Sequence, residues 1–108
     1  MVNQAAEAID PYKKAIKINE ISPEFHYNLA SAYMELGEFQ KAMNSFWNCL
    51  KYDSQNADAY YNIGKIFAEK EQKFGEAKKS FEKALHFNPR HEKAQTALSR
   101  LEETTEEK

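Results

Sequence analysis

The sequence predicts an all-α fold, a solenoid of antiparallel helix hairpins with about six helices. The letters YNLA at residues 27–30 return as YNIG at residues 61–64, which is a period of 34 residues. Self-similarity at this period is typical of chains in which each unit buries one face against its neighbours. Only three Gly and three Pro occur in 108 residues, and apolar residues recur three or four positions apart, which favours helices.

Composition excludes several classes of protein. With 42% hydrophobic and 30% charged residues, the chain suits one soluble domain with a modest core. It has neither a run of about 20 apolar residues nor a signal peptide, so we expect no membrane partner and a cytoplasmic location. The single Cys49 allows no disulfide within the chain. The net charge of -2, without a basic cluster, argues against nucleic acid.

Residues 1–22 are predicted to hold the second helix of an incomplete first repeat. Ala8, Tyr12 and Ala15 precede a matching Ala, Phe and Cys by 34 residues. Pro11 leaves two alternatives open, because an interior proline removes one helical hydrogen bond. The helix either bends at Pro11 or begins there.

Residues 23–56 are predicted to form a complete repeat. Ser22 and Pro23 are a plausible N-cap and first-turn proline, and Gly37 a terminator, for the first helix. A second helix begins at Phe39 and ends near the turn-forming residues 53–56. A turn this short makes the two helices antiparallel neighbours.

Residues 57–91 are predicted to form a second repeat, with helices from about Ala57 to Lys70 and from about Phe74 to Phe87. Here the second helix matches its predecessor at 35 residues rather than 34, so one residue has been inserted within 69–73. We expect the insertion to lengthen the turn. Residues 92–102 are expected to form a C-terminal capping helix, and residues 103–108 a frayed acidic tail.

The order of small and large residues resembles the tetratricopeptide repeat over residues 6–101. The matching residues are Leu29, Ala30, Tyr33, Gly37, Phe39, Ala42, Phe46 and Cys49, and then Tyr60, Ile63, Gly64, Phe67, Ala77, Phe81, Ala84 and Pro89. The resemblance implies a right-handed superhelix whose first helices line a concave groove for peptides. It also implies a non-enzymatic adaptor or scaffold that binds a peptide or helix of a partner protein. One departure is His26, which replaces a large aromatic residue.

The residues expected to face such a groove lie on the first helices and avoid their packing face. They are Tyr27, Asn28, Ser31, Met34, Tyr61, Asn62, Lys65, Lys93 and Arg100. An Asn amide can donate to and accept from a peptide main chain at once. Two alternatives stay open: the asparagines tie neighbouring hairpins together, and the tyrosine rings pack on adjacent helices.

The resemblance also argues against one specialised ligand. A subgroup of the family binds acidic chaperone tails through a lysine and an asparagine on an early helix and a lysine and an arginine on a late one. Tyr27 and Ser31 replace the early pair, and Ala97 stands where the arginine belongs, although Lys93 matches the late lysine. That clamp is therefore mostly absent.

A different class of function is self-assembly through the open N-terminal helix, with Ala8, Tyr12 and Ala15 at the seam. Trp47 occupies an otherwise solvent-facing position, so its indole either lies over a packed edge or contacts another chain. The three histidines and Cys49 lack the paired short spacings of a metal site. No catalytic motif occurs, so we expect no cofactor and no enzymatic activity.

Overall fold

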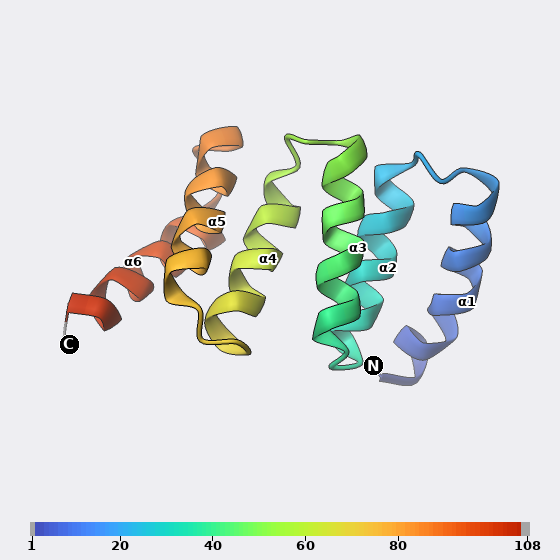
Figure 1. Cartoon of the computed structure of the whole chain (residues 1–108), viewed down its shortest axis with the longest axis horizontal. Coiled ribbons are helices and arrows are strands. Elements are labelled where there is room, and N and C mark those ends of the chain that lie inside the picture. Colours follow the sequence, from blue (N-terminus) through green and yellow to red (C-terminus); the bar gives the residue numbers. More distant parts are fainter. Residues whose placement is uncertain (1, 107–108) are drawn as a thin grey trace. The chain divides into compact units, whose positions relative to one another are not determined.

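The computed structural model describes residues 2–106, and the side chains of residues 4–103. Within that range the chain forms helices and no strand, which confirms the all-α prediction. The helices are α1 (Val2–Ile18), α2 (Pro23–Glu35), α3 (Phe39–Tyr52), α4 (Ala57–Glu69), α5 (Phe74–Phe87) and α6 (Glu92–Glu106). They divide into two compact units, unit 1 (Met1–Ser54) and unit 2 (Gln55–Lys108) (Figure 1).

Unit 1 consists of the α2–α3 hairpin with α1 packed against α2. Pro11 lies inside α1, which continues through it from Val2 to Ile18. A helix that begins at Pro11 is therefore excluded. The helix tolerates the missing hydrogen bond because α1 packs along α2, so tertiary contacts stabilise it as well as local propensity.

Unit 2 consists of the α4–α5 hairpin with α6 packed against α5 and, less extensively, against α4. Its core contains Ala77, Phe81 and Leu101, so α5 and α6 contribute to one cluster. Phe74, at the start of α5, packs partly buried against that cluster. The helix predicted to cap the chain is thus part of the hydrophobic core.

The two hairpins have helices of equal length and turns of different length. Helices α2 and α4 each have 13 residues, and α3 and α5 each have 14. Residues 36–38 join the first pair and residues 70–73 join the second, so the extra residue lies in the turn. Each turn contains one left-handed residue, Gly37 (φ 77°) and Gln72 (φ 53°). The glycine carries no Cβ penalty there, whereas the glutamine does.

Equivalent aromatic pairs support this alignment of the hairpins. His26 stacks on Tyr52 with ring centroids 5.7 Å apart, and Tyr60 stacks on Phe87 at 5.8 Å. His26 therefore replaces the expected aromatic ring as a packing element. Its Nε2 also lies 2.7 Å from the carbonyl oxygen of Glu20, which can only accept, so Nε2 carries the proton and donates.

Helices α4 and α5 approach closely at Gly64. Phe46 and Phe81 are among the largest fully buried side chains and occupy equivalent places in the two hairpins. A Cβ on Gly64 would lie 2.7 Å from Cε1 of Phe81 and 3.1 Å from Cβ of Ser80. Ala30, the equivalent of Gly64 in unit 1, is fully buried with its own Cβ. The helices of unit 2 therefore approach at a point where only glycine fits.

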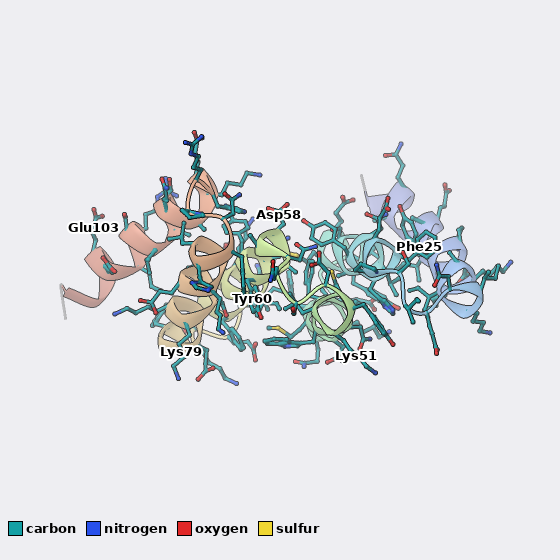
Figure 2. The ribbon with its side chains drawn as sticks, turned by 90° about the horizontal axis from the view of Figure 1, so that it is seen from above. Phe25, Lys51, Asp58, Tyr60, Lys79 and Glu103 are labelled. Atoms are coloured by element: carbon teal, nitrogen blue, oxygen red, sulfur yellow. The ribbon has the colours of Figure 1, made fainter. Side chains whose placement is uncertain are left out.

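The last helix is longer than the sequence predicts. We expected the helix to end at residue 102 and residues 103–108 to be frayed, but α6 continues to Glu106 and includes Glu103 (Figure 2). Glutamate has good helix propensity, and the segment contains neither glycine nor proline to end the helix. Residues 107–108 lie outside the described part.

Replacing Gly64 with alanine should destabilise the protein. Overpacking costs about 1–3 kcal/mol and better helix propensity returns about 1 kcal/mol, so we expect the free energy of unfolding to fall. Urea denaturation followed by circular dichroism measures this free energy.

Gly75→Ala is the matched control, because Gly75 is exposed in α5 and a Cβ added there would have no neighbouring atom within 4 Å. It should raise stability by about 0.5–1 kcal/mol. Equal effects of the two changes would contradict the packing argument.

Candidate functional site

The first helix of each repeat, and α6, begins at a residue whose side chain caps it. Ser22 Oγ accepts from the backbone N–H of Phe25 at 3.4 Å, and Asn56 Oδ1 accepts from that of Ala59 at 3.0 Å. His91 occupies the equivalent place before α6, where its Nδ1 accepts from the Ala94 N–H at 3.1 Å. These caps determine where the predicted groove-facing helices start.

The two tyrosines of the repeated YN motif are half-buried rather than exposed. Tyr27 packs edge-on against Phe46 with centroids 5.5 Å apart, and Tyr61 lies 6.0 Å from Phe81. Tyr61 also lies 5.2 Å from the ring of His91. The rings thus pack on neighbouring helices, which was the second alternative, and each leaves part of its surface open.

One groove of about 890 Å³ lies within unit 2. Its residues come from α4, α5 and α6 and comprise Tyr61, Asn62, Lys65, Ala68, Glu69, Phe74, Phe81, Glu92, Lys93, Thr96, Ala97, Arg100 and Leu101. Phe81 and Leu101 are buried in the core, so the floor of this groove is apolar. Three cations and two carboxylates complete the lining, which therefore carries a small excess of positive charge.

The structure brings five of the nine predicted groove residues together. Tyr61, Asn62, Lys65, Lys93 and Arg100 all line the groove of unit 2. The other four belong to α2 in unit 1, where each is half-buried; they are Tyr27, Asn28, Ser31 and Met34. Phe74 and Leu101 line the groove although they were not among the predicted residues. Both continue the apolar periodicity of their helices. That pattern indicates burial, but it does not distinguish a core residue from one on the floor of a groove.

His91 is a further residue of the site that the sequence did not reveal. Its ring is buried, and Nε2 lies 2.7 Å from Oδ1 of Asp58 on α4. Since Nδ1 accepts from the Ala94 N–H, the neutral ring must carry its proton on Nε2 and donate to the carboxylate. From the sequence, His91 was considered only as a metal ligand. His91 occupies the same position in the repeat as Ser22 and Asn56, and that match would have identified it as a helix cap.

The residues proposed for contact with another chain lie in unit 1. Trp47 on α3 is 46% exposed, whereas Met43 and Leu50, which lie four residues before and three residues after it on the helix, are buried. Among the described side chains, the exposed large hydrophobic residues are Trp47, Ile18, Ile21 and Tyr52, all of unit 1. On α1, the predicted seam residues Ala8, Tyr12 and Ala15 are each half-buried.

Cys49 is a buried neutral thiol in α3. Burial, and secondarily the negative charge of Asp53, raises the pKa of Cys49 from 9.0 to about 11. The thiolate required for nucleophilic or metal chemistry is therefore disfavoured at neutral pH. Nowhere in the described residues do three His, Cys, Asp or Glu side chains gather as a metal-binding group.

Comparison with protein families identifies the repeat. The sequence model described as TPR repeat matches residues 3–37 and 30–70, and the model of the tetratricopeptide repeat matches residues 57–91. Across residues 2–106, no helix has the length and apolar character needed to cross a membrane.

Individual relatives extend beyond this chain. The Homo sapiens "Protein O-mannosyl-transferase TMTC3" is 27% identical over 88 residues, which cover 82% of this chain and 10% of that protein. The Bos taurus "BBSome complex member BBS4" is 32% identical over 94 residues, covering 87% of this chain and 18% of that protein. The chain thus spans a small part of either curated relative.

One similar solved structure contains a peptide. The "First TPR of Spaghetti (RPAP3) bound to HSP90 peptide SRMEEVD" superposes with a TM-score of 0.86 at 30% identity. The similarity covers 95% of this chain and 81% of that one. The fold of this chain therefore matches that of a domain described with a bound peptide.

Cys49 should resist thiol reagents in the folded protein. At pH 8 the raised pKa keeps nearly all of the thiol protonated, and burial blocks access, so we expect a reaction at least tenfold slower than that of the urea-unfolded chain. Absorbance with a chromogenic disulfide reagent measures the rate of this reaction. Equal rates in both states would contradict the burial of this thiol.

The same thiol makes the stability of the fold depend on pH. Because the folded-state pKa of Cys49 lies above its unfolded value, this thiol contributes stability below about pH 9, and the contribution falls as pH rises toward 11.

Proposed function

The chain belongs to the tetratricopeptide repeat family, and on that premise we propose that it is a non-enzymatic module that binds a peptide or helix of a partner protein in the groove of unit 2. One observation carries the proposal. Side chains from α4, α5 and α6 converge on a single concave surface with an apolar floor and polar sides. Such a surface is the usual form of a binding site.

The lining suggests how a peptide would be held. An apolar side chain of the ligand would lie on the floor near Phe74 and Leu101. Asn62 would bond the ligand main chain, since an amide offers both a donor and an acceptor. Lys65, Lys93 and Arg100 would favour a segment with acidic residues over a basic one.

The peptide-bound neighbour supports the class of ligand. That domain is described as bound to the HSP90 peptide SRMEEVD. In this chain Ala97 lies in the groove at the place where a chaperone-binding arginine is expected. We therefore propose recognition based largely on main-chain contacts, in an adaptor or scaffold of the cytoplasm, rather than a clamp for chaperone tails.

A second candidate function is self-assembly through unit 1. The four exposed large hydrophobic residues of the described chain all lie there, and α1 packs on α2 with Tyr12 still half-buried. A second copy of the chain would remove this apolar surface from water.

Asn62→Ala should weaken peptide binding without unfolding the protein. We would select heptapeptides from a random phage-displayed library on the wild-type chain and measure their affinity by calorimetry. Loss of hydrogen bonds worth about 1 kcal/mol should reduce the affinity about fivefold. Asn28→Ala tests the equivalent rung in unit 1, and Asn48→Ala, an exposed change on α3, is the control. The groove proposal fails if the library yields no binder, or if Asn62→Ala binds as tightly as the control.

Sedimentation velocity at micromolar concentration tests the second candidate. Self-assembly predicts a dimer that Tyr12→Lys converts to a monomer, because a charge would be placed in the apolar seam. Lys13→Ala, an exposed change on the same helix, should leave the dimer intact. A strict monomer would eliminate this candidate.

A further inference from the structure

We propose that His91 is a positioning residue that holds the start of α6, and with it one wall of the groove, only while its imidazole ring is neutral. The control of ligand binding by pH rests on the proposed groove function, whereas the loosening of α6 on protonation of His91 does not. The proposal adds a control by pH to a groove whose own lining contains no histidine.

The neutral ring connects two helices through both nitrogens. Its Nδ1 accepts from the N–H of Ala94 in the first turn of α6, at 3.1 Å. Its Nε2 donates to Oδ1 of Asp58 in the first turn of α4, at 2.7 Å. Both bonds form at the same time only in the tautomer with the proton on Nε2.

A second proton would leave the ring with no acceptor. Both nitrogens would then be donors, and Nδ1–H would point at the Ala94 N–H, so the cap of α6 must break. The bond to Asp58 would gain charge and persist. The side chain of Asp58 is 65% exposed, so solvent screens this attraction and the carboxylate can follow a displaced ring.

Charged and titratable residues lie on both sides of the ring. Asp58 and Tyr61 face it from α4. Arg90, Glu92 and Lys93 flank it along the chain and are exposed. The basic residue in the last turn of α5, which precedes His91 in the chain, is the exposed His86. Within the part of the chain that the structure describes, the side-chain acceptor of the Ala94 N–H is Nδ1 of His91.

The ring also touches the groove directly. Tyr61 lies 5.2 Å from His91 and lines the groove, and the next two residues, Glu92 and Lys93, line it from α6. Figure 2 shows Asp58 and Tyr60 on α4, the helix that carries this side of the site. Displacing the start of α6 therefore moves a cation and a carboxylate of the groove relative to Tyr61.

The other two caps provide an internal comparison. Ser22 and Asn56 cap α2 and α4 with oxygen atoms that do not titrate near neutral pH. Protonation of the His91 ring on acidification should therefore loosen the start of α6 and spare the start of α4.

NMR of the ¹⁵N-labelled protein tests the proposal without any peptide. At pH 8 the His91 ring should show the tautomer protonated on Nε2. As the pH falls to about 5, the Ala94 amide should shift with the titration of this ring, and the protection of the first amides bonded within α6 should fall about fivefold after correction for intrinsic exchange. The Ala59 amide, capped by Asn56, should show neither change. A ring protonated on Nδ1 at pH 8, or an Ala94 amide that ignores the titration, would overturn the proposal.

Two variants separate the parts of the mechanism. His91→Asn supplies the non-titrating cap found at Asn56 and should abolish the pH response of α6 while retaining the fold. Asp58→Asn keeps an acceptor for Nε2–H without its charge, so the pH response of Ala94 should remain. A pH response that survives His91→Asn would assign the effect to another group and overturn the proposal. Because these readouts need no ligand, failure of the pH response is distinct from failure to select a peptide.

Discussion

The packing of unit 2 depends on the close approach of Phe81 to Gly64. The ring occupies the space that a side chain at position 64 of α4 would need, so α4 and α5 can pack with this aromatic ring between them. From this contact, the core continues through Leu101 to α6. The groove lies over the same cluster, because Phe81 and Leu101 belong both to the core and to the groove floor. A change in helix packing would therefore alter the binding surface directly.

Much of the fold could be predicted because it depends on residue order along the chain. Apolar spacing located the helices, and the shift from a period of 34 to 35 located the insertion in the turn that contains Gln72. The predicted end of α6 was wrong because glutamate-rich segments are compatible with both helix and coil. Propensity differences there are a few tenths of a kcal/mol per residue, which is too small to decide.

The candidate site was only partly predictable. Residues that avoid the packing face of α4 and α6 were found from helical periodicity, and Asn62 and Lys93 do line the groove. Whether the tyrosine rings pack on adjacent helices was left open, because periodicity gives the direction of a side chain and not the reach of its neighbours. The link between His91 and Asp58 joins residues 33 positions apart. Such a contact depends on how three helices pack, which no local pattern records.

The short turns have a consequence for the kinetics of folding. Each hairpin joins its helices through residues 36–38 or 70–73, so most of its contacts form between residues close in sequence. Little chain entropy is lost in closing such turns, and chains with local contacts cross a low barrier to folding. Each hairpin can then act as a cooperative nucleus on which a flanking helix, α1 or α6, condenses. The strain of a left-handed Gln72 falls within the α4–α5 nucleus, so we expect that nucleus to form more slowly than the α2–α3 hairpin, where the same conformation falls on Gly37.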